Sequence, residues 1–220
     1  MKTVLMHSLN FKAGRCLLAV ICFSFLSVAN ADEVASSAEE INPIMVGDKL
    51  PEVALKNTKG KTVKLSGLIQ AKPTVLIVYR GGWCPYCNTH LANLRKIEDE
   101  LKSLGFQILA VSPDQPKFLN ETVTKNKLGY TLLSDSDMAV AKALGLAFQV
   151  DEPTLKKYDE YGIDLEEASG QSHKLLPVPA AILVNAQGEV TFTFVAPNYK
   201  VRLDNDVLLA AAKAQLKSKN

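Results

Sequence analysis

The stretch "TVLIVYRGGWCPYC", residues 74–87, joins the clearest strand pattern of the chain to a C-x-x-C pair. Residues 74–79 form a continuous, mostly apolar and β-branched run, which predicts a strand buried on both faces of a sheet. Gly81 and Gly82 then permit a tight turn, and Pro85 favours the first turn of a helix. The stretch therefore predicts a strand, a turn and a helix that begins at the two cysteines.

The rest of the chain alternates between strand and helix patterns. Apolar residues recur at helical spacing at positions 91, 94, 97, 101 and 104, which predicts a helix over 85–104 that ends at Gly105. We also expect short edge strands at 52–55 and 62–65, strands at 106–112 and 130–135, helices at 115–129 and 136–146, a hairpin at 180–195 and a closing helix from Asp204. This order predicts an α/β fold in which helices flank a central mixed β-sheet.

The first 31 residues have the pattern of a secretory signal peptide. Lys2, Lys12 and Arg15 accompany an apolar segment at 16–28, and residues 29–31, "ANA", form a small-x-small cleavage site. A membrane anchor is the less favoured alternative, because about 20 apolar residues are needed to span a bilayer. We expect a cleaved signal at 1–31, a flexible lead-in at 32–43 and one domain at 44–220. The domain would be exported, to the periplasm in a Gram-negative bacterium and otherwise outside the cell, without stable membrane insertion.

Cleavage after Ala31 changes the charge and the cysteine content. It removes three basic residues and no acidic one, so the formal net charge of +2 becomes −1. A nearly neutral domain lacks the basic surface of a nucleic-acid-binding protein, so no nucleic-acid partner is expected. Cleavage also removes Cys16 and Cys22, which leaves Cys84 and Cys87 as the only cysteines of the domain.

Three roles are open for the remaining cysteine pair. A structural disulfide across so short a loop removes little entropy from the unfolded chain, which disfavours a staple. A zinc site needs four ligands, and besides the cysteines the domain has just His90 and His173, far apart in sequence, and nothing that resembles a second C-x-x-C. The pattern therefore favours a reactive dithiol, with no metal and no other cofactor.

The motif and its surroundings resemble a known superfamily. "WCPYC" after a buried strand resembles the thioredoxin-like active site, and "LLPVPAAILVN" resembles the segment that ends in a cis-proline, here Pro179. "GDKLPEVALKNTKGKTVKLSGL" and "FQILAVSPD" are similar to the alkyl hydroperoxide reductase C/thiol-specific antioxidant branch, over about residues 44–217. The resemblance implies a thioredoxin-like, peroxiredoxin-type fold, a peroxide substrate and a thioredoxin-like or other dithiol reductant. A homodimer is left open.

The residues near the motif predict different roles for the two cysteines. Cys84 lies at the expected helix N-terminus, where unpaired N–H groups stabilise a thiolate, so we expect it to be the nucleophilic, peroxidatic residue. Cys87 shares the apolar helical stripe and is expected to resolve the intermediate by a redox disulfide with Cys84. Arg80 is either a thiolate stabiliser or a solvated loop residue, and Trp83 either covers the dithiol and contacts substrate or is plain core.

The resemblance adds two residues to the site and leaves the reaction open. It implies Arg202 as a second thiolate stabiliser and Pro179 as a substrate-binding residue. The peroxiredoxin signature P-x-x-x-T/S-x-x-C is incomplete, because Ile77 and Gly81 take the places of its proline and threonine. Three functions therefore remain: a thiol peroxidase, favoured by the overall resemblance; a thiol–disulfide oxidoreductase acting on protein cysteines, favoured by the local motif; and a binding module with an idle disulfide.

Two histidines and a long insert have less certain roles. His90 is expected on the helix surface, with a nearby base as the alternative, and His173 is expected in a loop near Pro179. The segment 148–175 is long for a connection and contains one expected helix at 153–162. Such an insert covers the dithiol or mediates dimerisation.

Overall fold

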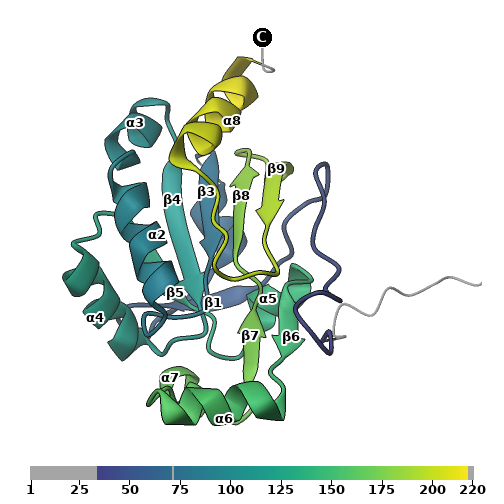
Figure 1. The fold of residues 1–220 in the computed structure, drawn as a ribbon. Coiled ribbons are helices and arrows are strands. Elements are labelled where there is room, and N and C mark those ends of the chain that lie inside the picture. Colours follow the sequence, from purple (N-terminus) through teal and green to yellow (C-terminus); the bar gives the residue numbers. More distant parts are fainter. Residues whose placement is uncertain (1–33, 71, 218–220) are drawn as a thin grey trace, which may run out of the picture.

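The computed structural model describes residues 34–70 and 72–217. Its main sheet has seven strands in the order β2-β1-β5-β4-β3-β8-β9 (Figure 1). β3, β4 and β5 are parallel, and the remaining strands join them antiparallel, so the sheet is mixed as predicted. The strands are β1 Ala54–Asn57, β2 Thr62–Lys64, β3 Thr74–Val78, β4 Gln107–Ser112, β5 Thr131–Ser134, β8 Ala180–Val184 and β9 Val190–Val195.

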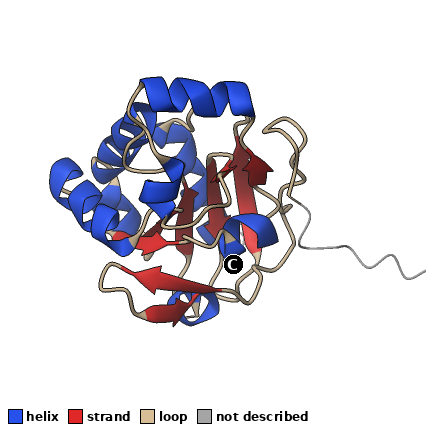
Figure 2. Ribbon diagram, turned by 90° about the horizontal axis from the view of Figure 1, so that it is seen from below, coloured by secondary structure: helices blue, strands red, loops and turns tan. Residues whose placement is uncertain are grey.

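Helices cover both faces of this sheet, which explains why every residue of β3 is buried. Val75 and Ile77 belong to a core that includes leucines of α2, α4 and α8, whereas Leu76 and Val78 belong to a second core with α1 and α5. Figure 2 shows the helices packed around the strands. The helices are α1 Leu65–Ile69, α2 Pro85–Arg95, α3 Glu98–Ser103, α4 Pro116–Asn126, α5 Ala139–Ala143, α6 Glu152–Glu160, α7 Leu165–Ser169 and α8 Asn205–Lys217.

The helix expected over 85–104 is two helices, α2 and α3, with a break at Lys96 and Ile97. The break has a cause outside the segment. The carbonyl of Asn93 accepts a 2.9 Å hydrogen bond from the side chain of Asn205, at the start of α8, and another from the N–H of Lys96. In a continuous α-helix, this carbonyl would instead accept a hydrogen bond from the N–H of Ile97. Within α3, Glu98 and Lys102 lie one turn apart and form an ion pair at 2.6 Å.

The lead-in expected to be flexible is held against the domain over residues 34–43. Ala35 donates to the carbonyl of Ala147 and accepts from the N–H of Gln149, at 3.2 and 2.9 Å. Val34 and Ile41 pack against the buried cores. The acidic and polar composition of the segment did not indicate these contacts, which join residues 34–43 to the domain.

The segment 148–175 forms a small layer at one end of the sheet. It begins and ends in a two-stranded sheet, β6 Ala147–Gln149 with β7 Leu175–Pro177, and contains both α6 and α7 (Figure 1). Only α6 was expected. This layer, called the insert below, lies next to the end of β3 that leads into α2.

Within the described residues, no helix is long and apolar enough to cross a membrane. The predicted signal peptide at 1–31 lies outside the described residues, as does the cleavage site after Ala31.

Candidate active site

The two cysteines occupy the start of α2, as the sequence predicts. Cys84 is the N-cap residue of the helix, and Cys87 lies in its first turn. Both are free thiols, and their exposed fractions are only 1% and 0%. The dithiol is therefore sheltered from solvent, where hydrogen bonds and nearby charges act strongly on ionisation.

The environment separates the acidities of the two thiols. The pKa of Cys84 is lowered from the ordinary value of 9.0 to about 6, first because the Cys87 side chain donates a hydrogen bond to it. The Cys87 backbone N–H and the charges of Arg80 and Arg202 lower this pKa further, and burial opposes them. The pKa of Cys87 is raised, because the same hydrogen bond and its own burial favour the neutral thiol. Cys84 is thus the thiolate-forming member of the pair.

Arg202 approaches the dithiol from the segment between β9 and α8. Its Nη2 lies 3.5 Å from the Sγ of Cys87, and its Nη1 donates to the carbonyls of Tyr199 and Val201. These carbonyl contacts fix the guanidinium group beside the sulfur. The arginine suggested by the resemblance is therefore in the site, and its direct sulfur contact is with Cys87 rather than with Cys84.

Arg80 is buried, with an exposed fraction of 3%, so the alternative of a solvated loop arginine is wrong. Its guanidinium carbon lies 5.1, 5.5 and 4.0 Å from the ring centres of Trp83, Tyr158 and Tyr199. It also donates a hydrogen bond to the hydroxyl of Tyr158. Aromatic faces stabilise a cation that burial would otherwise disfavour.

Trp83 joins the dithiol turn to the insert. Its ring centre is 5.7 Å from that of Tyr158 on α6, and it packs with the apolar side chains of the insert, including Ile163. The side chain is half-buried, so it is not a plain core residue. Of the two roles considered for the insert, contact with the active-site turn is present in the structure.

The predicted cis bond at Pro179 is absent: no peptide bond within the described residues is cis. The chain enters β8 in an extended path, in which the N–H of Val178 donates to Leu146 and the carbonyl of Pro179 accepts from Ala196. Proline at the entry to a strand needs no N–H partner, so the trans form satisfies this path. Pro179 lines a pocket together with Arg80 and Tyr158.

Asp114 is a site residue that sequence reasoning missed. Its carboxylate accepts hydrogen bonds from the N–H of Gly82 at 2.7 Å and from the hydroxyl of Ser112 at 3.1 Å. Burial, with a smaller contribution from the negative charge of Cys84, raises its pKa to about 6, and the hydrogen bonds from Gly82 and Ser112 oppose this shift. A signal was available, because Asp114 follows the end of β4 and the carboxyl ends of parallel strands meet at one edge of a sheet.

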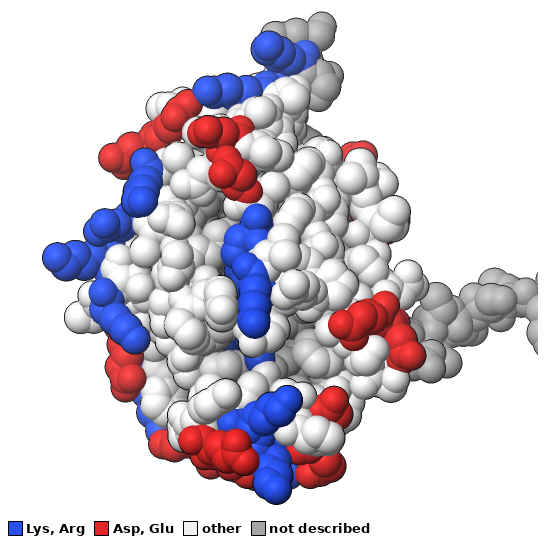
Figure 3. Space-filling view, in the orientation of Figure 1, with Lys and Arg blue, Asp and Glu red and all other residues white. Residues whose placement is uncertain are grey.

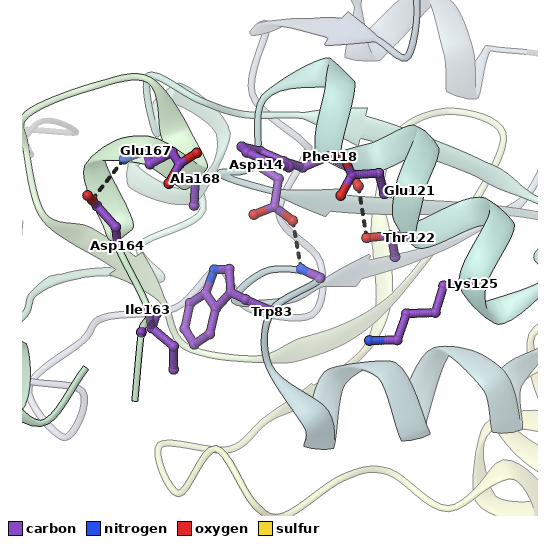
Figure 4. A pocket seen from close by; sticks show the side chains of 12 residues that line it. Trp83, Asp114, Phe118, Glu121, Thr122, Lys125, Ile163, Asp164, Glu167 and Ala168 are labelled. Carbon is purple, nitrogen blue, oxygen red and sulfur yellow. Dashed lines mark hydrogen bonds between the residues drawn. The ribbon is translucent and has the colours of Figure 1, made fainter. Parts of the chain in front are cut away.

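Asp114 and Trp83 face a cavity of about 290 Å³ beside the turn (Figure 4). The two glycines of the turn are required by close packing here. A Cβ on Gly81 would lie 2.3 Å from Trp83 Nε1 and 2.8 Å from Asp114 Oδ1, and its φ of +151° disfavours other residues. The cavity is lined by Gly82, Trp83, Asp114, Phe118, Glu121, Thr122, Lys125, Gly162, Ile163, Asp164, Glu167 and Ala168.

The structure places both histidines where they support packing or hydrogen bonding. His90 is buried rather than on the helix surface, because it lies one turn after Cys87 on the same face of α2, and burial lowers its pKa to about 4. His173 lies 2.9 Å from the carbonyl of Ser136 and accepts a hydrogen bond from the N–H of Leu175, which fixes the start of β7.

Alkylation of the reduced protein measures the difference between the thiols. We expect iodoacetamide to label Cys84 with a pH midpoint of about 6, and to label Cys87 much more slowly at every pH below 9, because only Cys84 is a thiolate there. Peptide mapping by mass spectrometry gives both rates. Equal rates, or faster labelling of Cys87, would contradict the arrangement at the helix start.

Replacement of Asp114 by asparagine tests its coupling to Cys84. Above pH 6 the wild-type carboxylate is charged and repels the thiolate. We expect Asp114→Asn to move the alkylation midpoint of Cys84 down by roughly half a unit to one unit. The folded-state pKa of Asp114 is above its ordinary 3.8, so wild-type protein loses stability as the pH rises from about 4 to about 6, and the variant should lose less. An unchanged midpoint would show that the carboxylate does not act on Cys84.

The fold and the dithiol define a thioredoxin-like oxidoreductase. Residues 46–193 match the model of the AhpC/TSA family, and the chain belongs to that family.

Individual relatives narrow the class. The putative peroxiredoxin bcp of Haemophilus influenzae is 38% identical over 106 residues, which cover 48% of this chain and 68% of the relative. Peroxiredoxin Bcp of Escherichia coli is 33% identical over 106 residues, with 48% and 67% covered. Reduced Prx3 from Vibrio vulnificus, solved in complex with H₂O₂, has a similar fold, with a TM-score of 0.63 at 23% identity over 77% of this chain and 99% of that chain. The chain is a peroxiredoxin-type oxidoreductase, a thiol peroxidase.

Proposed function

We propose that this protein is an exported thiol peroxidase that reduces hydroperoxides through a Cys84–Cys87 dithiol–disulfide cycle, with an external dithiol as the reductant. The observation that carries the proposal is the difference in acidity within the pair. A thiolate at Cys84 and a neutral thiol at Cys87, joined by a hydrogen bond, supply the nucleophile and the resolving group side by side.

The cycle would run in three steps. The Cys84 thiolate attacks the terminal oxygen of the hydroperoxide, an S–O bond forms, the O–O bond breaks, and the departing alkoxide or hydroxide takes up a proton. Cys87 then loses its proton and attacks the Cys84 sulfenic acid, which forms the disulfide and releases water. An external dithiol returns two electrons and two protons to the pair.

Arg80 and Arg202 are the groups that support the first step. Both guanidinium charges lower the pKa of Cys84. The Nε atom of each arginine is buried and has no hydrogen-bond partner among the described residues. These N–H groups are unpaired donors on the two arginines whose charges act on Cys84, and a donor fixed in a buried site stabilises negative charge that develops on a departing oxygen.

Mixing reduced protein with one equivalent of hydrogen peroxide tests the proposal. Trp83 is the only tryptophan and adjoins Cys84, so its fluorescence should report oxidation in a stopped-flow experiment. We expect oxidation far faster than that of a free thiol of pKa about 6. If oxidation is no faster, the peroxidase proposal is lost. Mixed disulfides between Cys87→Ser protein and cellular proteins would then favour the thiol–disulfide oxidoreductase.

Export is tested separately. We expect the mature protein to begin at Asp32, because the small-x-small site ends at Ala31. Intact-mass measurement of the protein recovered from the cell envelope or the medium gives the N-terminus. A mass that includes residues 1–31, found for protein in a membrane fraction, would show that the segment is not cleaved and would indicate a membrane anchor.

A further inference from the structure

Exposed apolar side chains gather beside the dithiol. Tyr86, Tyr199 and Val201 have exposed fractions of 42%, 36% and 48%, and they are among the few large hydrophobic side chains that are exposed in the described part of the chain. The rings of Tyr86 and Tyr199 meet edge to face, with centres 5.7 Å apart. With the exposed Lys200 between the last two, these residues are called the rim patch below.

The rim patch borders the dithiol. Tyr86 is between the two cysteines in the first turn of α2. The other three residues precede Arg202, whose Nη2 is 3.5 Å from the Sγ of Cys87, and the ring of Tyr199 lies 4.0 Å from the guanidinium carbon of Arg80. A protein whose sulfur approaches the pair from the side of Tyr86 and Tyr199 would therefore contact the rim patch.

Lys200 adds a positive charge to the rim patch. The Nζ of Lys200 is 6.0 Å from the ring centre of Tyr86, and Lys200 forms no ion pair with a described carboxylate. Figure 3 shows a stripe of basic side chains in the middle of the face seen there, with uncharged surface on both sides and acidic side chains beyond its upper end. Exposed tyrosines are typical of the centre of a protein interface, and a charge at its border favours a partner of opposite charge.

We propose that the rim patch is the docking surface for the protein dithiol that reduces the Cys84–Cys87 disulfide, and that this partner presents an apolar surface bordered by acidic side chains. The inference rests on the proposed dithiol–disulfide cycle. A thiolate of the partner attacks one sulfur of the disulfide and forms a mixed disulfide, and the other sulfur leaves as a thiolate and is protonated. The second partner thiol then attacks the partner's sulfur in the mixed disulfide, and the remaining cysteine of this protein leaves as a thiolate and is protonated. The partner ends as a disulfide, and both cysteines are reduced.

The reduction step can be measured without peroxide. The protein is oxidised with diamide, and the return of the dithiol is followed by Trp83 fluorescence with one of three reductants: dithiothreitol, a reduced thioredoxin of acidic isoelectric point, or a thioredoxin-fold dithiol protein of basic isoelectric point. The variants are Tyr86→Ala and Lys200→Glu. The matched controls are Tyr161→Ala, which removes a tyrosine with an exposed fraction of 75%, and Lys59→Glu, in an exposed turn.

We expect each rim-patch variant to slow reduction by the acidic thioredoxin about tenfold and to leave reduction by dithiothreitol unchanged. Raised salt should weaken the wild-type rate and remove the effect of Lys200→Glu. The controls should react as wild type, and the basic protein should be a poor reductant. A rim-patch effect equal to that of the controls, or an equal loss with dithiothreitol, would overturn the inference.

Two other outcomes separate this inference from the proposed function. If the rim-patch variants slow reduction but reduced wild-type protein does not turn over peroxide with dithiothreitol, the peroxidase is wrong and the docking surface stands. If sedimentation shows a dimer that Tyr86→Ala dissociates, a second copy of the chain occupies the rim patch, and the inference fails while the peroxidase stands.

Discussion

Replacing Cys84 by serine is expected to lower the rate of peroxide consumption by at least about a thousandfold. With a pKa of about 6, Cys84 is mostly a thiolate at neutral pH, whereas a serine hydroxyl stays protonated and is a poor nucleophile. Arg80 and Arg202 have no anion to stabilise in the variant. Single-turnover stopped-flow measurement with hydrogen peroxide, and steady-state turnover with dithiothreitol, give the two rates.

Cys87→Ser is the matched control, because it separates the first chemical step from the second. The serine hydroxyl can still donate a hydrogen bond to Cys84, which is the first cause of the lowered pKa. We therefore expect this variant to reduce one equivalent of peroxide and then stop, with a Cys84 sulfenic acid that dimedone traps. Cys87→Ala lacks the donor, so its first turnover should be slower and need a higher pH. Retention of the burst in Cys84→Ser and its loss in Cys87→Ser would reverse the two roles.

The site could be predicted from sequence as far as it is local. The run at 74–79, the glycines and Pro85 were enough to place Cys84 at a helix start and Cys87 in the first turn, because each pattern depends on neighbouring residues. The mixed sheet with helices on its faces followed from the alternation of strands and helices, whereas the order of the strands did not. His90 could also have been found, since it lies three residues from Cys87, on the apolar face of α2.

The features of the site and fold that the sequence did not predict depend on contacts between distant segments. Arg80 is buried because Tyr158 reaches it from the insert, 78 residues away in sequence, and neither residue alone indicates that pairing. From its neighbours in sequence, Asp114 would be predicted to be an exposed loop residue. Its place in the site becomes visible only when the ends of β3 and β4 are placed side by side. The break before α3 has a similar origin, because Asn205 takes a carbonyl of α2. Patterns in a single sequence indicate local structure over a few helical turns. These contacts are tertiary, so such patterns do not indicate them.

Restoring the signature threonine by Gly81→Thr is expected to damage the protein rather than to improve the peroxidase. The new Cβ would meet Trp83 Nε1 and Asp114 Oδ1 at distances shorter than real contacts, and the φ of +151° is unfavourable for a β-branched residue. Overpacking and backbone strain together should lower the free energy of unfolding by roughly 2–5 kcal/mol. Displacement of Trp83 and of the turn that Asp114 holds should also slow the single-turnover reaction with peroxide at least about tenfold.

Gly67→Thr is the matched control for this change. Gly67 lies in α1, is exposed, and has open space where a Cβ would be placed. The free energy of unfolding of the Gly67→Thr protein should therefore differ from that of wild type by less than about 0.5 kcal/mol. Urea denaturation compares the three proteins, and the stopped-flow rate compares their sites. A Gly81→Thr protein that is as stable as wild type and reacts faster with peroxide would mean that the turn before Cys84 can adopt the geometry of the threonine signature. The packing of Trp83 and Asp114 against Gly81 would then not be what excludes that residue.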